Sequence, residues 1–138
     1  METAEVIKKA AEIVKPDVVI VIDSLAARDI DRVSTTIQLT DTGIQPGSGM
    51  GNHRAGINEE NIGVPVLAIG VPTVIDIKTI LRDALEENLD SAEAVEKYLS
   101  DYDRQMIVTS TDIDILVKDF SDIIADGINK TLHPGIYS

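Results

Sequence analysis

The chain contains no cysteine and no tryptophan, and its 138 residues include one phenylalanine and three tyrosines. Without cysteine there can be no disulfide bond, no thiol nucleophile and no zinc–thiolate site. The lack of cysteine also fits a reducing cytoplasm. With so few aromatic residues, the core has to be built from Ile, Val, Leu and Ala, which is typical of a parallel sheet buried under helices.

Positive charge is scarce as well, because 12 Lys and Arg face 24 Asp and Glu and the net charge is −12. A surface this acidic repels phosphate backbones, so we expect no direct binding of nucleic acid. The longest strictly aliphatic run, Val18 to Ile22, has five residues, whereas a membrane-spanning helix needs about 20. The first residues have mixed charge and no apolar stretch of the signal-peptide kind. The sequence therefore predicts a soluble, cytoplasmic protein without a membrane partner.

Strand-like and helical patterns alternate along the chain. Residues 17–23 (DVVIVID) and 64–71 (VPVLAIGV) are mostly apolar, which is typical of strands buried on both faces. Helices are expected over residues 2–14, which end before Pro16, and over residues 74–87. The first of these helices has an apolar stripe formed by Val6, Ile7, Ala10, Ile13 and Val14.

Further short elements complete this pattern. Residues 33–40 and 105–109 favour strands. The Thr-Ser-Thr-Asp signal at residues 109–112 predicts the start of a helix that runs to about Leu132. The order predicts a single α/β domain over residues 1–138, with a mainly parallel sheet flanked by helices. Three or four strands make a thin sheet, so we expect the chain to form part of a larger fold.

Asp23 directly follows the first apolar strand. In open parallel sheets, ligands and catalytic groups gather beyond the carboxyl ends of the strands. A carboxylate at such an end is partly desolvated, which suits it to general acid or base catalysis. The alternative is a structural role, in which Asp23 caps the following turn through a local hydrogen bond.

Hydrolysis of a peptide bond by carboxylates usually takes two of them, one accepting a proton from water while the other donates one. Asp41 and Asp76 are the candidates expected to reach the same sheet edge as Asp23. Each has a structural alternative: Asp41 can open a turn, and Asp76 can lie in the first turn of a helix, where the dipole favours negative charge. Arg28 can pair with Asp23, bind substrate or form a structural salt bridge.

Residues 41–56 form a long loop with five glycines and one proline. Such a loop in a compact domain is often functional, and we expect it to cover a bound substrate. The covering residues are expected to be Gly47, Ser48, Gly49, Gly51 and Asn52. The loop lacks the Lys-Ser/Thr of a phosphate-binding loop, and Ser48 has no adjacent base for a catalytic triad. His53 and His133 lack metal-ligand spacing, so we expect no metal and no cofactor.

Several contiguous stretches carry a close resemblance to one known family. They are IDSLAAR (22–28), TIQLTDTGIQPGSGMGN (36–52), VPVLAIGVPTVID (64–76) and MIVTSTDIDILVKDF (106–120). Together with the opening helix, they resemble the germination proteases of spore-forming bacteria over nearly the whole chain. The resemblance implies an α/β fold similar to that of the hydrogenase maturation proteases, which is the phosphorylase/hydrolase-like fold.

The resemblance also implies an activity. These proteins are aspartic-type endopeptidases, made as zymogens, that degrade small acid-soluble spore proteins when the spore germinates. The family implies a homo-oligomer, a tetramer, in the cytoplasm of the forespore or spore core. One of its two proposed catalytic aspartates matches Asp23. The other belongs to an upstream segment that nothing here matches, so the chain resembles the C-terminal half of the enzyme.

A second hypothesis assigns the chain to a different class of protein. A sporulation protein that lacks catalytic activity could keep the same fold for binding or assembly. The missing second carboxylate is compatible with either hypothesis.

Overall fold

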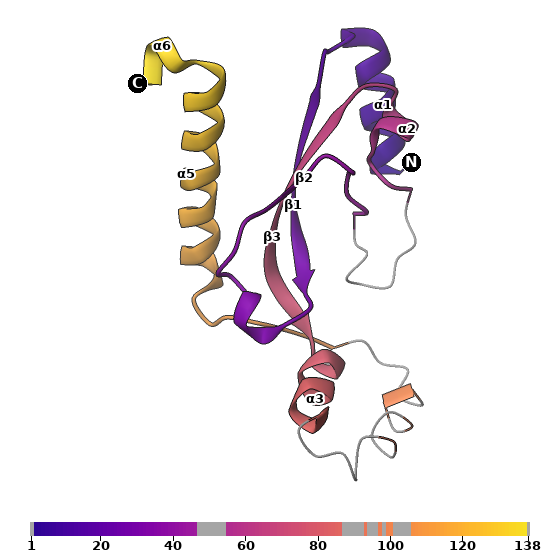
Figure 1. The fold of residues 1–138 in the computed structure, drawn as a ribbon, viewed down its shortest axis with the longest axis vertical. Coiled ribbons are helices and arrows are strands. Elements are labelled where there is room, and N and C mark those ends of the chain that lie inside the picture. The colour runs from indigo at the N-terminus through magenta and orange to yellow at the C-terminus, as the bar shows by residue number, and fades with distance from the viewer. Residues whose placement is uncertain are drawn as a thin grey trace.

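The computed structural model describes residues 2–46, 55–86, 93, 97, 99–100 and 106–137. It is an α/β structure in which α5 stands on one side of the sheet, while α1 and α2 lie on the other (Figure 1). In chain order the elements are α1 (Thr3–Val14), β1 (Val19–Ala27), the 3₁₀ helix η1 (Ile30–Arg32), β2 (Gln38–Thr40), α2 (Glu59–Ile62), β3 (Val66–Asp76), α3 (Ile77–Glu86), β4 (Ile107–Thr109), α5 (Ile113–Leu132) and α6 (Pro134–Tyr137).

The sheet is built around β3, its longest strand. β1 pairs with β3 in parallel along its whole length. On the other edge of β3, first β2 and then β4 pair with it in the antiparallel direction. The sheet is therefore mixed, and the prediction of a mainly parallel sheet is wrong. No α-helix separates β1 from β2, so the chain reverses through η1, and a direct reversal produces an antiparallel strand.

Both long strands continue beyond their predicted ends. β1 runs to Ala27 instead of ending at Asp23, and β3 runs through Pro72 to Asp76. Proline is tolerated there because the register of β1 against β3 shifts between Leu25 and Ala26, next to the pair that Leu25 forms with Pro72. The consequence for the site is that Asp23 lies in the middle of its strand.

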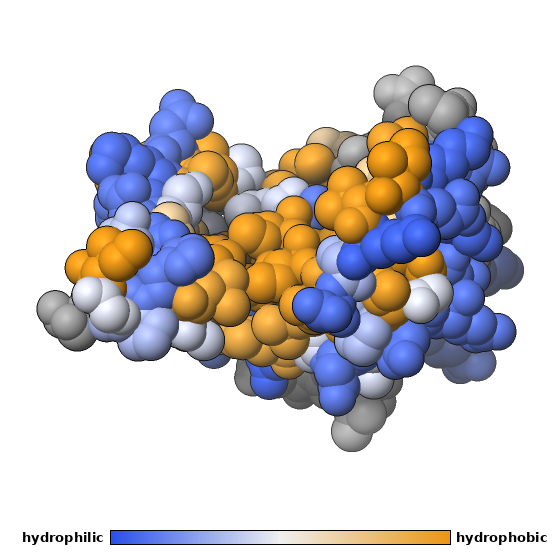
Figure 2. Space-filling model, turned by 90° about the horizontal axis from the view of Figure 1, so that it is seen from above, coloured by the Kyte–Doolittle hydropathy of each residue, from blue (hydrophilic) through white to orange (hydrophobic). Residues whose placement is uncertain are grey.

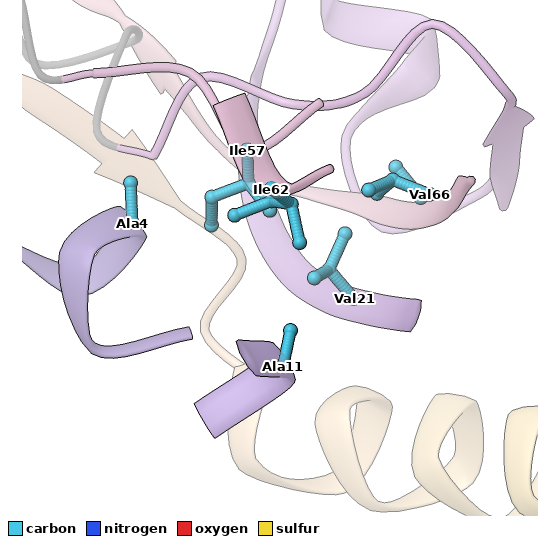
Figure 3. Close-up of a cluster of buried hydrophobic side chains, with 7 residues drawn as sticks. Ala4, Ala11, Val21, Ile57, Ile62 and Val66 are labelled. Atoms are coloured by element: carbon cyan, nitrogen blue, oxygen red, sulfur yellow. The ribbon is translucent and has the colours of Figure 1, made fainter. Parts of the chain in front are cut away.

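The main core fills the space between α1, α2 and the sheet. Its buried residues are Ala4, Ala11, Val21, Ile57, Ile62, Val66 and Ala68. Figure 3 shows Ala4 and Ala11 pointing from α1 toward the isoleucines and valines of this cluster. This arrangement fixes α1 against the face of the sheet on which Val21 lies.

The buried face of α1 differs from the predicted stripe. Ala4 and Ala11 are buried and Ile7 packs beside them, whereas Ile13 and Val14 are 82% and 72% exposed. The buried positions follow the three- and four-residue spacing of one helix face. Small alanine side chains on that face let the helix approach the sheet closely.

The opposite face of the sheet is apolar and largely uncovered. Within α5 no residue is buried, and a groove of about 370 Å³ separates this helix from the sheet. Leu39, Leu67 and Ile69 line the groove from the sheet, and Ile124 and Ile128 line it from α5. Figure 2 shows apolar surface in this hollow. Among the helices in the described ranges, none is long and apolar enough to cross a bilayer.

Candidate active site

Asp23 lies in the middle of β1, opposite Gly70 of β3. Its side chain is half-buried, and its Oδ1 accepts a hydrogen bond of 2.9 Å from the backbone N–H of Ser24. The carboxylate lines a pocket of about 420 Å³ together with Ile7 of α1 and Pro46. Asp23 does not cap a turn, because the strand continues past it. It is a carboxylate that accepts one local hydrogen bond, in a residue that lines a cavity.

The glycine-rich loop begins beside this pocket. Ile44 and Ile57 form an isolated antiparallel bridge, with N–H to carbonyl distances of 2.9 and 2.8 Å. The bridge closes the base of the loop, and Pro46 then lines the Asp23 pocket. The residues predicted to cover substrate, Gly47, Ser48, Gly49, Gly51 and Asn52, lie outside the described residues.

Gly43 is needed at the loop base, and Gly43→Ala is expected to destabilise the protein by about 2–4 kcal/mol. Its φ of +88° is unfavourable for any side chain, and a Cβ would overlap the Ile57 carbonyl oxygen and lie 2.6 Å from the Cβ of Asn58. Thermal unfolding measures the effect. Gly63→Ala is the matched control, because Gly63 has a φ of +89° with nothing within 4 Å of its Cβ position.

The control variant carries the backbone strain alone, so we expect a loss of about 1–2 kcal/mol from Gly63→Ala. If both variants unfold at the same temperature, the overlap of a Cβ at position 43 with Ile57 and Asn58 costs no stability. That result would contradict the prediction.

Asp76 ends β3 and caps the helix that follows. Its Oδ1 accepts a hydrogen bond of 2.7 Å from the backbone N–H of Lys78, at the start of α3. Asp76 therefore lies near the place that its structural alternative predicted, which was the first turn of a helix. Along β3, Asp76 is six residues beyond Gly70, the partner of Asp23, and six residues of strand span about 20 Å.

Asp41 lies at the other end of the sheet. It follows β2, which runs antiparallel to β3 and reaches Ala68 at Thr40. The predicted meeting of Asp41, Asp76 and Asp23 at one sheet edge is therefore wrong. It failed because β3 is longer than predicted and β2 runs in the reverse direction. Within the described ranges, no three His, Asp or Glu side chains are close enough to hold a metal ion together.

A second cavity lies where the parallel strands β1 and β3 end. This cleft has a volume of about 550 Å³. Its polar lining consists of Arg28, Arg32, Gln38, Asp76 and Thr79. Arg28 shares this cleft with Asp76, whereas Asp23 lines the other pocket. The structure thus brings two predicted site residues together, but separates them from Asp23.

Sequence reasoning missed the other residues of this cleft. Gln38 and Thr79 belong to no catalytic or binding motif that the sequence identifies, and the cleft they line lies where β1 ends, at Ala27. Arg32 had a usable signal, since it lies four residues after Arg28 in a segment rich in turn-forming Asp. The short helix η1, at Ile30–Arg32, places both arginines at one cavity.

Known proteins are similar to this chain over nearly its whole length. The family model described as germination protease matches residues 1–92. The chain belongs to the germination protease family. The germination protease of Caldanaerobacter subterraneus subsp. tengcongensis is 44% identical to it over 159 residues, covering 99% of this chain and 49% of the relative. That of Clostridium perfringens is 42% identical with the same coverage.

A more distant germination protease, from Halalkalibacterium halodurans, is 31% identical and covers 99% of this chain and 51% of the relative. The chain therefore spans about half the length of the curated germination proteases that it matches. The described residues of this chain include Asp23, the base of the glycine-rich loop and the arginine-lined cleft.

Proposed function

We propose that this chain is the part of a germination protease that carries Asp23 as one of two catalytic carboxylates. The whole protein would be an aspartic-type endopeptidase that begins the degradation of small acid-soluble spore proteins during germination. One observation carries the proposal: Asp23 is a half-buried carboxylate in mid-strand, and it lines a cavity beside the base of the glycine-rich loop.

The local geometry suits a general base. The N–H of Ser24 holds Oδ1 of Asp23, which leaves Oδ2 to accept a proton from a water molecule. That water forms the new C–O bond to the scissile carbonyl, and the C–N bond breaks as the second carboxylic acid gives its proton to the leaving amine. Asp23 alone supplies the first of these two transfers.

Within the described residues, neither candidate carboxylate is placed to act as the partner of Asp23. Asp41 and Asp76 are both displaced along the sheet from Asp23. We assign the missing group to the part of the relatives that this chain does not match. The uncovered groove between α5 and the sheet supports the same assignment, because the other half of the family fold would supply apolar surface to fill it.

The assembly and location of the whole protein are part of the same proposal. Its partners would be the spore-protein substrates and further copies of itself, in a homo-oligomer such as a tetramer. Its place would be the cytoplasm of the forespore or spore core.

The test uses a completed protein, in which these 138 residues replace the matching half of the Caldanaerobacter germination protease. It is incubated with a small acid-soluble spore protein, and fragments are separated by mass spectrometry. Cleavage at discrete peptide bonds is the expected result. Binding of the spore protein without any cleavage would contradict the proposal and favour the alternative of a sporulation protein that only binds or assembles.

A further inference from the structure

The carboxylate of Glu2 does not serve the helix that it precedes. Glu2 occupies the N-cap position of α1, and its backbone carbonyl accepts hydrogen bonds from the N–H groups of Glu5 and Val6. An N-cap side chain ordinarily accepts a hydrogen bond from the first turn, and Ser, Thr, Asp and Asn do this best. Within the first turn of α1, which the structure describes in full, the Glu2 side chain makes no such bond. Its Oε2 instead accepts a hydrogen bond of 3.2 Å from the backbone N–H of Ala55, which is 53 residues further along the chain.

Ala55 belongs to the segment that leaves the glycine-rich loop. Three consecutive residues of this segment are held by three different parts of the chain. Glu2 holds Ala55 to the start of α1. The carbonyl of Gly56 accepts a hydrogen bond of 2.8 Å from Nδ2 of Asn61 in α2, and the next residue forms the bridge that closes the loop base. Of these three contacts, the one made by Glu2 ties the segment to α1.

The loop base and the start of α1 are two walls of the same pocket. Ile44 and Ile57 line the Asp23 pocket from the loop base. Thr3, the residue directly after Glu2, lines it from α1. Asp23 itself is fixed separately, because its strand pairs with β3 along its whole length. The hydrogen bond from Ala55 to Glu2 therefore joins two walls of the pocket without involving the carboxylate between them.

We propose that Glu2 is a positioning residue whose carboxylate holds the loop base against α1 and so sets the shape of the Asp23 pocket. The proposal rests on the proposed function for what the pocket binds. A hydrogen bond to an ionised carboxylate is stronger than one between neutral groups, which suits this acceptor to an exposed contact. Loss of the bond should weaken the binding of peptide substrate, whereas proton transfer at Asp23 should continue as before.

Two conservative variants separate this role from the ordinary one of a carboxylate beside a helix N-terminus. Negative charge at that place stabilises a helix through its dipole. In the dipole role Glu2→Asp would be tolerated, because Asp keeps the charge and is a good N-cap, and Glu2→Gln would not. In the proposed role the order is reversed. Glu2→Gln keeps an oxygen acceptor at the same reach from the Ala55 N–H, whereas Glu2→Asp is shorter by one carbon.

The first test measures hydrogen–deuterium exchange of the Ala55 amide in the 138-residue chain by NMR. Glu2→Ala and Glu2→Asp should speed exchange at Ala55 about tenfold, and Glu2→Gln should keep most of the protection. Glu5→Ala is the matched control, since it removes a carboxylate from the first turn of the same helix and should leave the Ala55 amide unchanged. Thermal unfolding of each variant shows that the fold is kept.

The second test measures steady-state cleavage of a spore protein by the completed protein. Glu2→Ala and Glu2→Asp should raise KM about fivefold and leave kcat within about twofold. Glu2→Gln and Glu5→Ala should have the KM of the unaltered protein. A lower kcat at constant KM would contradict a role in shaping the pocket, because the loss would then lie in the chemical step.

Two exchange results would overturn the positioning role. They are equal exchange at Ala55 in the unaltered chain and in Glu2→Ala, and protection that Glu2→Asp keeps while Glu2→Gln loses it, which is the signature of the dipole role. The exchange experiment needs no turnover, so it is independent of whether Asp23 is catalytic. If the completed protein depends on Asp23 but no Glu2 variant changes the exchange of Ala55, the positioning role fails and the proposed function stands.

Discussion

The 138-residue chain on its own is expected to show no measurable peptide cleavage. Asp23 can accept a proton, but of the carboxylates considered within the described residues neither Asp41 nor Asp76 is placed to donate one to the leaving amine, because both lie elsewhere along the sheet. Loss of one member of a catalytic pair typically lowers the rate by several orders of magnitude. Incubation with a spore-protein substrate, beside the completed protein, measures the difference.

If the chain alone does cleave the substrate, variants of its own aspartates would identify the second carboxylate. Turnover by the chain alone that disappears in Asp41→Asn or Asp76→Asn would show that the site is complete within these 138 residues. The assignment of the second carboxylate to the other half of the family fold would then be wrong.

In the completed protein, Asp23→Asn is expected to lower kcat by a factor of about a thousand or more. The amide has nearly the same shape, and its oxygen can still accept the hydrogen bond from Ser24. It cannot accept a proton from water, so the attacking group stays neutral and unreactive. Steady-state cleavage of a spore protein gives the rate, and thermal unfolding shows whether the fold is kept.

Asp17→Asn is the matched control for this variant. Asp17 is an exposed carboxylate just before β1, so the substitution changes charge and shape in the same way at a distance of about 20 Å along the strand. Its activity should equal that of the unaltered protein. Equal activity losses in the two variants would assign the effect to net charge and not to Asp23.

Helices were the part of the fold that the sequence predicted well. α1, α3 and α5 begin and end within about three residues of their predicted limits, because helix signals are local: an apolar period, a capping residue and a proline near the end. The buried face of α1 was less predictable. Which side of a helix is buried depends on what the sheet presents, and the sheet accepts Ala4 and Ala11 more closely than Ile13 or Val14.

The strands show the limit of reasoning from apolar runs. Asp23 interrupts such a run, and Pro72 normally ends one, yet both strands pass through these positions. Pairing between the strands and the shift in register at Leu25 are long-range features, and no local pattern encodes them. The direction of β2 was also not predicted, because it depends on the reversal of the chain through η1.

The candidate site was predicted in part. Asp23 was expected at a strand end and lies in mid-strand instead, as a half-buried carboxylate beside the loop base, and its catalytic role stays a prediction. Arg28 was a candidate substrate ligand and lies in a cleft, where that role remains a prediction. The partners proposed for Asp23 were wrong because a site that joins several strands depends on their register.

The most direct test of the central claim is chemical rescue of Asp23→Ala in the completed protein. This variant removes the carboxylate and leaves space for a small molecule beside β1. The account predicts a rate near background that formate raises at least about tenfold, while formamide, which has the same shape without the charge, leaves it unchanged. An Asp23→Ala protein that cleaves the spore protein as fast as the unaltered protein would contradict the claim that Asp23 is a catalytic carboxylate.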